Sequence, residues 1–384
     1  MSALTVRSLP GVSAVDPAAW DALVGPEGSP FFEHAFLSAV EAASATPRHG
    51  VLPCHFAAFE GERLVAALPL YVKGDPRGEF AYDWSFELLA SRQGLPYYPK
   101  AVSMAPFTPA EGSRPLVAPD RPRAPLEAAL LEAAERWARQ AGLTGLHLLY
   151  LPEEQAEALE GRGWLRRLGW QLCWTRAPRE RTWEDLLARL RSKERVKFKR
   201  ERRRLEEAGL RLEVVEGQAI DEEHRDALWT FWSDTCARYG TGSRYLQRRT
   251  WELLFERFRA RLVLFCARGP RGLVAGALCV HKGQELWGRY WGAQVELPGL
   301  YFNLTMYRPL ELLAERGWRR FHLGAGQADY KLARGFEPLP VHGAHRLFEP
   351  RLHAAVERFL ARERPAVAAQ MREVRVSSPP GEGT

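Results

Sequence analysis

The apolar positions of the chain form short patterns that recur in its two halves. Residues 64–73 (LVAALPLYVK) and 273–282 (LVAGALCVHK) match at four positions without a gap, and each follows a strand-like segment and a turn. Apolar runs bounded by such turns predict a strand, a tight turn and a second strand. A third strand is predicted after each hairpin, at 79–86 (EFAYDWSF) and 285–293 (ELWGRYWGA).

Helical patterns follow the predicted strands in both halves. Residues 125–142 and 308–317 each end in Gly, a common residue at helix C-termini. Each predicted helix leads into a strand with a central histidine, His147 in the first half and His322 in the second. Because the two histidines recur between apolar neighbours, we expect both to be core residues.

The order of the matched segments predicts a duplicated α/β fold. An RGW segment at 162–164 is echoed by RGF at 334–336, so four short matches occur in the same order. Internal similarity of this kind indicates a repeated structural unit. A meander followed by a helix and a parallel strand is the order of the GNAT acyltransferase fold, a mixed sheet with helices on both faces. The sequence therefore predicts tandem GNAT-like domains at 1–180 and 181–364, and a C-terminal tail (365–384) whose last part is expected to be disordered.

Composition narrows the class of protein. The chain has 384 residues, of which 46% are hydrophobic and 26% charged, as is typical of a globular protein with room for two domains. It has no apolar run long enough for a membrane-spanning helix, and its first residues lack the basic and apolar segments of a signal peptide. The five cysteines form no CxxC pair, so neither a disulfide framework nor a metal site is expected. A cytoplasmic location is predicted.

One basic stretch differs from the rest of the chain. Residues 191–204 (RSKERVKFKRERRR) hold nine Lys or Arg and two Glu, so their net charge equals the +7 of the whole chain. Arg195, Lys199 and Arg203 fall on one face of a helix, which makes them candidates for binding an anion or a tRNA. A solvated helix face explains the same pattern, and the sequence leaves both interpretations open.

The same region predicts the helix that opens the second domain. Thr182 with Asp185 resembles a capping box, which marks a helix start. Phe198 and Leu205 are spaced to form an inward-facing stripe, and a break is expected near Ser192.

Several segments resemble those of a known family. They are FEHAFLSAVE (32–41), ALPLYVK (67–73), GEFAYDWSF (78–86), YYPK (97–100), PFTP (106–109), GRYWG (288–292) and KLARGFEP (331–338). Together they resemble the FemAB-like predicted N-acyltransferases, a bacterial group associated with peptidoglycan biosynthesis or recognition. The resemblance spans nearly the whole chain.

The resemblance implies an activity. Fem-type transferases have two GNAT-like domains, of which the second carries the transfer site, and they move an aminoacyl group from a charged tRNA onto an amine of a peptidoglycan precursor. For this chain it implies an N-acyltransferase or aminoacyltransferase acting on an amine acceptor, with a cell-wall precursor as the candidate. No tightly bound cofactor is expected, and the acyl donor is either an aminoacyl-tRNA or an acyl-CoA.

The chain departs from the family pattern in two segments. Relatives usually have GAQGEHK before the LARGF segment, whereas this chain has GAGQADYK at 324–331. Relatives also tend to carry a Glu and a Cys after GRYWG, whereas residues 296–307 contain Glu296 and no Cys. If that His or Cys is catalytic in relatives, this protein either differs from them in mechanism or is impaired. Tyr330 and Lys331 look like the aromatic–Lys pair that lies beside the acyl group in Fem-type enzymes.

Transfer of an acyl group to an amine sets the requirements for the site. The amine must be neutral, the donor must be held, and the oxyanion that forms at the carbonyl must be stabilised. Lys331 is the candidate for catalysis, and Tyr330 is the candidate proton donor to the leaving group. The structural alternative is a surface lysine at the start of a helix.

The GRYWG segment supplies candidates for binding the substrate. In a strand Trp287, Arg289 and Trp291 share one face, and glycines within a strand mark a bulge or the close approach of a ligand. Arg289 is expected to hold an anionic group with cation–π support, together with Tyr290 and Trp291. Arg334 of the RGF segment completes this set. The alternative is an aromatic face that packs on a helix.

The first domain offers four further substrate-binding candidates. Glu79 and Asp83 are predicted to lie on one face of a strand, and Lys100 and Arg114 flank a proline-rich loop. Long loops without secondary structure of their own tend to be functional or disordered. A strap that joins the domains is the structural alternative.

Other chemistries find little support. His342 and His345 lie near the second-domain site by chain order and are further candidates for a base. The chain has no GxSxG, HExxH or P-loop motif. It also lacks the glycine-rich loop that binds the pyrophosphate of acetyl-CoA at a helix N-terminus in many GNAT enzymes. The alternatives to a Fem-type transferase are a CoA-dependent N-acyltransferase of a small amine and a non-catalytic protein that recognises peptidoglycan or RNA.

Overall fold

The computed structural model describes residues 3–46, 49–80, 83–239, 245–324, 326 and 329–377. The chain forms two compact units, and neither is continuous in sequence. Unit 1 comprises 1–169, 245–254 and 340–369, and unit 2 comprises 170–244, 255–339 and 370–384. The predicted boundary near residue 180 concerns the two sequence repeats and stays a prediction.

The strands of unit 1 belong to two sheets. In one sheet they run in the order β1-β3-β4-β7, and in the other in the order β15-β8-β6-β5-β2. Their bounds are β1 Leu4–Leu9, β2 Val51–Pro53, β3 His55–Glu60, β4 Arg63–Leu68, β5 Tyr71–Lys73, β6 Lys100–Ser103, β7 Leu116–Val117, β8 Gly145–Leu151 and β15 Glu337–Leu347. The pairs are antiparallel except β6–β8, which is parallel.

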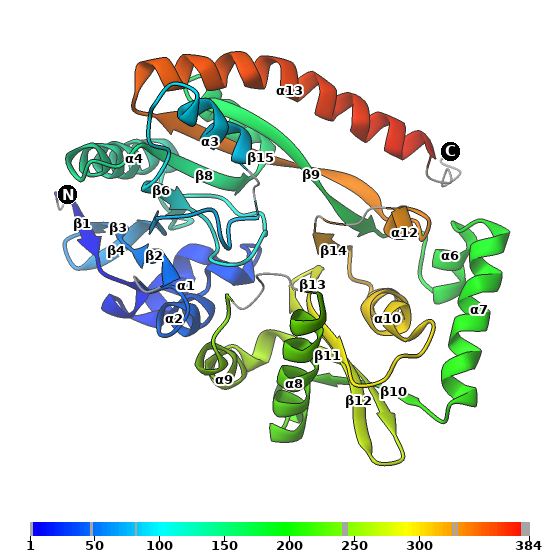
Figure 1. Cartoon of the computed structure of the whole chain (residues 1–384). Helices are drawn as coiled ribbons and strands as arrows, with labels where there is room; N and C mark the ends of the chain where they lie inside the picture. Colours follow the sequence, from blue (N-terminus) through cyan, green and yellow to red (C-terminus); the bar gives the residue numbers. More distant parts are fainter. Residues whose placement is uncertain are drawn as a thin grey trace. The chain divides into compact units, whose positions relative to one another are not determined.

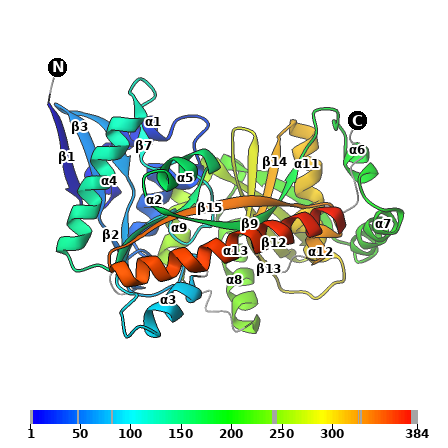
Figure 2. The same ribbon diagram turned by 90° about the horizontal axis from the view of Figure 1, so that it is seen from above.

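Helices cover the sheets of unit 1. They are α1 Pro17–Val24, α2 His34–Glu41, α3 Trp84–Ser91, α4 Arg123–Gln140 and α5 Glu153–Glu160. The long helix α4 packs on β1, β3, β4 and β8 (Figure 2). Its buried positions Leu126, Leu130 and Ala134 recur at helical spacing and join the apolar core beneath.

A proline explains why the first repeat is divided between two sheets. Residues 64–73 were predicted as one strand, but Pro69 separates β4 from β5. Proline cannot donate a ladder hydrogen bond, so a strand ends or bends where it occurs. The second copy has Leu278 at the matching position, and there β12 runs without interruption from Gly272 to Lys282.

The predicted third strand of the first half is wrong. Residues 79–86 were expected to be a strand, but helix α3 begins at Trp84, and Glu79 and Asp83 lie in turns. The alternation of aromatic and polar residues resembles that of a strand. The segment instead begins a short helix, which buries only one side, here Phe86 and Ala90. The strand that extends the sheet is β6, which begins at Lys100.

Unit 2 is built on one mixed sheet. Its strands run in the order β10-β11-β12-β13-β14-β9, and their bounds are β9 Leu165–Thr175, β10 Arg211–Glu216, β11 Leu262–Gly269, β12 Gly272–Lys282, β13 Glu285–Ala293 and β14 Arg320–Gly324. The strands β10 to β13 form the predicted antiparallel meander. Strand β14 is parallel to β13 and antiparallel to β9.

Unit 2 also contains helices, of which α8 and α11 contact strands of this sheet. The helices are α6 Trp183–Ala188, α7 Ser192–Glu207, α8 Glu222–Tyr239, α10 Leu300–Phe302, a π-helical turn Asn303–Tyr307, α11 Arg308–Arg316 and α12 Asp329–Leu332 (Figure 1). Helix α8 packs on β12 and β13, and a Cβ at Gly292 would lie 2.1 Å from the backbone of Phe231 in α8. This glycine therefore permits the close approach of the helix. Helices α9 (Arg248–Arg257) and α13 (Pro350–Ser377) contribute residues to both units.

Most of the predicted repeat is confirmed. Helices α4 and α11 occupy the two predicted segments, and α11 ends at Gly317 in the left-handed conformation. The histidine-bearing strands β8 and β14 follow them. No helix in the described part of the chain is long and apolar enough to cross a membrane.

The helix predicted to open the second half is also confirmed. Thr182 and Asp185 form the capping box of α6, and a new helix, α7, starts at Ser192, where the break was expected. Phe198 and Leu205 are buried on its inner side. The tail beyond residue 377, predicted to be disordered, lies outside the described residues.

Candidate functional sites

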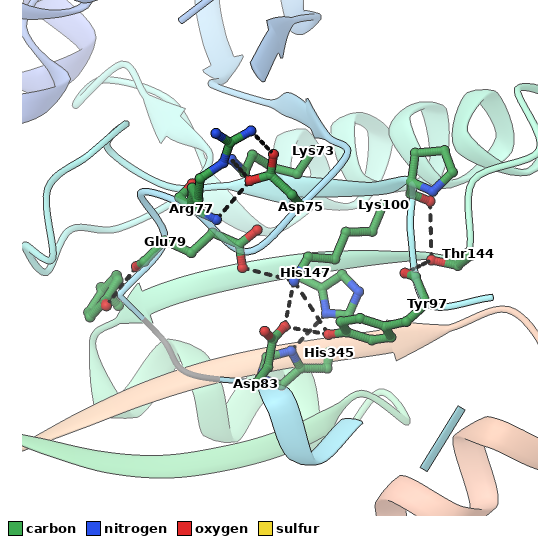
Figure 3. A network of polar contacts seen from close by, with 12 residues as sticks. Lys73, Asp75, Arg77, Glu79, Asp83, Tyr97, Lys100, Thr144, His147 and His345 are labelled. Carbon is green, nitrogen blue, oxygen red and sulfur yellow. Dashed lines mark hydrogen bonds and ion pairs between the residues drawn. The ribbon is translucent and has the colours of Figure 1, made fainter. Parts of the chain in front are cut away.

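Three of the four candidates from the first half meet in a buried polar cluster in unit 1 (Figure 3). Lys100, the first residue of β6, is fully buried, and its Nζ lies 2.8 Å from a carboxylate oxygen of Glu79. It also forms a short ion pair with Asp83. The hydroxyl of Tyr97 donates to the same oxygen of Asp83. Glu79 and Asp83 therefore converge on one cation, although they do not share a strand.

The two carboxylates of this cluster titrate differently. Burial opposes the charge on Asp83, but the attraction of Lys100 and the hydrogen bonds outweigh it and hold its pKa below the usual range. For Glu79, burial and the negative charge of Asp83 outweigh Lys100, and its pKa is raised to about 7. The pKa shifts of the two carboxylates therefore have opposite directions, although both carboxylates contact the amine of Lys100. Asp83 has the extra hydrogen bond from Tyr97, so it carries the charge of the pair.

Two histidines adjoin the cluster. Nδ1 of His147 in β8 lies 2.9 Å from Nδ1 of His345 in β15. Burial and nearby cations lower the pKa of both, to about 3 for His345. Both rings are therefore neutral at physiological pH. His342 and His345, expected near the second-half site by chain order, lie on strand β15 among the residues 340–369 of unit 1.

Arg114, the fourth candidate of the first half, makes other contacts. Its guanidinium is buried, donates to the carbonyl of Leu149 and lies 4.9 Å from the ring centroid of Phe32. Burial lowers its pKa to about 9. Glu79, Asp83, Lys100 and Arg114 are all buried. Their binding of substrate stays a prediction.

Lys331, the candidate catalytic lysine, lies in unit 2 on helix α12. Its side chain is buried to 6% exposure, and its Nζ donates to the carbonyls of Leu323 and Gly326 at 3.1 and 3.3 Å. Burial lowers the pKa of the amine to about 8. A lysine in this state loses its proton close to neutral pH, as a general base must. The predicted alternative, a surface lysine, is wrong.

Tyr330 belongs to an aromatic group next to Lys331. Its hydroxyl lies 3.0 Å from that of Tyr301, and its ring packs edge-on against Phe302. Arg334 lies over the ring of Phe302 at 3.5 Å, and its Nε donates to Tyr307 at 2.8 Å.

Arg334 also has a charged partner. One of its terminal nitrogens lies 3.5 Å from Glu201 of α7, whose other carboxylate oxygen accepts from the Tyr307 hydroxyl at 2.6 Å. Arg334 is only 2% exposed. These contacts favour a structural role for Arg334, and its predicted role in substrate binding stays a prediction.

The predicted face of β13 is wrong because the strand contains a bulge. The register of β12 with β13 shifts where Leu278 pairs with Tyr290 and Cys279 with Gly288, so Arg289 is the extra residue. The bulge reverses the alternation, so that Trp287 stacks on His322 while Trp291 packs against the core on the other face.

The bulge also changes the surroundings of the two remaining candidates in this strand. The Arg289 guanidinium lies 5.3 Å from the ring centroid of Tyr290. Tyr290 packs edge-on against Trp232. The glycines of GRYWG were predicted to mark a bulge or a close approach, and both predictions are confirmed, at Gly288 and Gly292.

The parallel strands β13 and β14 share a short ladder. Their pairing in the described residues comprises Glu285 with Arg320, Leu286 with Phe321 and Trp287 with His322. Strand β13 continues to Ala293, well beyond this ladder.

His322 forms the last pair of this ladder, and the residues that surround it were not predicted from the sequence. Nε2 of His322 lies 2.6 Å from Glu285, and across the other edge of β14 the histidine pairs with Cys173 of β9. Burial opposes protonation of the ring, but hydrogen bonds and charges of Cys173 and Glu285 outweigh it and raise the pKa of His322 to about 10. The repeat of the histidine was visible in the sequence. Its partners were not, because strand β9 lies far away in the chain.

The basic stretch forms the outer face of α7. Lys199 and Arg203 are exposed, whereas Arg195 is half-buried and donates to the carbonyl of Leu190 at 2.8 Å. Binding of an anion or a tRNA by these residues stays a prediction.

Comparison with solved structures defines the class of fold. The crystal structure of FemX aligns with 91% of this chain and all of its own, at 12% identity and a TM-score of 0.57. A conserved protein of unknown function from Bacteroides thetaiotaomicron aligns with 89% of this chain and 100% of its own, at 10% identity and a TM-score of 0.54. The fold is thus the tandem GNAT-like arrangement of mixed α/β sheets found in Fem-type proteins.

The sequence itself identifies the family. The model of the FemAB-like family, described as peptidoglycan biosynthesis/recognition, matches residues 11–380. The chain belongs to this family. No curated protein matches the sequence significantly.

Proposed function

We propose that the protein is an N-acyltransferase that moves an acyl or aminoacyl group onto an amine. The proposed site lies in unit 2, beside strands β13 and β14. One observation carries the proposal: among the described residues the ladder of β13 with β14 comprises three pairs, and β13 continues past the last of them. An acyl donor that lies along β13 could place its carbonyl oxygen close to the backbone of this strand. A backbone N–H that hydrogen-bonds to this oxygen would stabilise the oxyanion of the transition state.

Lys331 supports the proposal by its position and its pKa. The lysine is held to the carbonyl of Leu323 in β14, one residue beyond the last ladder pair, and its pKa is about 8. In its neutral form it can accept the proton that the amine loses when the amide forms. Tyr330, next to it in the chain, is the proposed proton donor to the leaving group. An amine of a peptidoglycan precursor is the proposed acceptor, because the family is described as peptidoglycan biosynthesis/recognition.

The test measures transfer by Lys331 variants. Wild-type protein is incubated with aminoacyl-tRNA or acyl-CoA and an amine-bearing peptidoglycan precursor, and the product is followed by mass spectrometry. We expect Lys331→Ala to lower the rate by roughly 10²-fold or more without a change in the melting temperature. The wild-type rate should rise with pH through about 8.

Lys331→Arg is the matched control. It retains a cation but cannot act as a base at this pH, so it should be as slow as Lys331→Ala. Full activity of Lys331→Ala would refute the role of this lysine. The two donors compared in parallel also distinguish a tRNA-dependent enzyme from a CoA-dependent one.

A further inference from the structure

We propose that the outer face of helix α7 binds the surface of a bilayer that contains anionic phospholipids. This face consists of exposed cations that surround one exposed apolar side chain, Val196. The inference concerns where the protein is held, and it does not depend on the proposed acyl transfer. The cations of the face are Lys193, Lys199, Arg200, Arg203 and Arg204.

The inner face of α7 fixes which side chains point outward. Phe198 is buried, and its ring packs edge-on against Tyr307 at a centroid distance of 4.6 Å. Arg202 on the flank donates to Asn303 at 2.7 Å and to Glu311 at 2.8 Å. The helix is thus attached along one side to other elements of unit 2, and its basic side stays in contact with solvent.

The cations of the outer face are not neutralised by the protein. None of the ion pairs in the described part of the chain involves these five side chains. Of the glutamates of the helix, Glu194 and Glu201 are buried on the inner side, and Glu206 and Glu207 lie at the C-terminal end. The five cations span about 16 Å of the helix, so they form a row of uncompensated positive charge.

Val196 lies in the middle of this row. Lys193 precedes it by three residues, and Lys199 and Arg203 follow it by three and seven, which places all of them on one side of the helix. Its side chain is 64% exposed, more than that of any other exposed large apolar residue in the described ranges. A valine ringed by cations is unfavourable in water, but it matches the boundary between lipid headgroups and acyl chains.

An anionic bilayer is complementary to this face in charge and in polarity. A single Lys or Arg close to an anionic membrane strengthens adsorption by roughly fivefold. Their long side chains reach the phosphate groups while the helix lies parallel to the membrane, and no membrane-spanning helix is needed. The attraction weakens with salt, because charges are screened over about 10 Å at 0.1 M.

RNA is the other polyanion that a basic helix attracts, and the geometry favours a bilayer over RNA. Proteins hold single-stranded RNA by stacking its bases on aromatic rings. The aromatic ring of this helix, Phe198, is buried on the inner side. Duplex RNA has a major groove too narrow for side chains to read, so the helix would touch phosphates alone. Phosphates offer no apolar contact to Val196, whereas a bilayer does.

Flotation of the full-length protein with vesicles tests the inference. Vesicles of phosphatidylcholine are compared with vesicles that contain about one third phosphatidylglycerol. We expect the protein to float with the anionic vesicles at low salt, to be released at high salt, and to ignore phosphatidylcholine. Equal binding to both kinds of vesicle, or binding to neither, would overturn the inference. No acyl donor is present, so this result is separate from the test of transfer by Lys331 variants.

Charge variants locate the binding face. Lys199→Ala with Arg203→Ala should weaken binding to the anionic vesicles by roughly 30-fold. The matched control, Arg358→Ala with Arg362→Ala, removes two exposed cations from helix α13 and should change binding by less than about twofold. Both pairs alter exposed side chains, so the melting temperature is expected to stay unchanged. An equal loss in the two pairs would show that net charge rather than this face binds lipid, which overturns the inference.

Val196→Trp separates a bilayer from RNA. The larger apolar side chain should strengthen binding to anionic vesicles by roughly tenfold. Brominated lipid should also quench the fluorescence of this variant more than that of the wild type. If the substitution leaves vesicle binding unchanged, and tRNA at the same salt concentration displaces the wild-type protein from the vesicles, the face binds RNA and the inference is overturned.

Discussion

The two copies of one strand carry the same histidine in opposite electrostatic surroundings. His147 of β8 pairs with Val102 of the parallel strand β6, and His322 of β14 pairs with Trp287 of β13 in the same way. Two residues before each of these partners stands a charged residue, Lys100 in unit 1 and Glu285 in unit 2. Lys100 helps to hold His147 neutral, whereas Glu285 helps to hold His322 protonated.

This reversal of charge also explains why the unit 1 cluster contains two carboxylates. In unit 2 the repeat lysine Lys282 pairs across the hairpin with Glu285. In unit 1 its counterpart Lys73 pairs with Lys100, so the same position has two cations and no anion. Glu79 and Asp83 supply the missing negative charge to Lys100 from a loop. Two copies of a fold thus keep their backbone and differ in the charge that each histidine meets, which decides its chemistry.

The largest effect is expected from Lys100→Met. This change leaves two buried carboxyl groups without a cation, and breaking a buried ion pair in this way costs about 3–5 kcal/mol. Urea denaturation followed by circular dichroism measures the loss. Lys100→Met combined with Glu79→Gln and Asp83→Asn removes the uncompensated charge and should recover part of the stability. A loss below about 1 kcal/mol in the single variant would show that the cluster does not depend on its cation.

The pH dependence of stability is expected to have opposite signs in the two units. The pKa of His345 is lowered to about 3, so its contribution is present above the unfolded pKa of about 6.5 and is lost as the pH falls toward 3. The pKa of His322 is raised to about 10, so its contribution is present below about 6.5 and is lost as the pH rises through 10.

Hydrogen exchange of β8 and β14 can separate the two contributions. Protection of β8 should fall on acidification and protection of β14 on alkalinisation, each by about 1.4 kcal/mol per unit of pKa shift at most. Imidazole NMR signals give the two pKa values directly. Glu285→Lys would copy the unit 1 arrangement and should lower the pKa of His322. An unchanged pKa in that variant would contradict the role given to Glu285.

The smallest effect on stability is expected at the outer face of α7. Lys199→Ala with Arg203→Ala should change the free energy of unfolding by less than about 0.5 kcal/mol, because both side chains are exposed. Phe198→Ala on the inner face of the same helix should cost about 3–5 kcal/mol. If the face binds tRNA, the double variant should reduce the slope of log affinity against log salt concentration, by the amount expected for the loss of about two phosphate contacts. An unaltered salt response would exclude binding of tRNA by this face.

The sequence predicted those features that depend on local pattern. The meander of the second half, the helices α4 and α11, the capping box at Thr182 and the bulge among the glycines of β13 all follow from short-range preferences. The predicted third strand of the first half was wrong because 79–86 alternates like a strand, whereas a helix begins at Trp84. The predicted face of β13 was wrong because one bulge reverses the direction of every side chain beyond it.

By itself, the sequence determined the duplication, the family and the position of the repeated histidine, because each is written in residues that are close together in the chain. Only the tertiary structure decided what each histidine does. Strand β15 brings His345 to His147, and strand β9 brings Cys173 to His322, from segments more than a hundred residues away. A pKa depends on the charges and the burial around a group. Those neighbours are chosen by strand pairing, which no local pattern encodes.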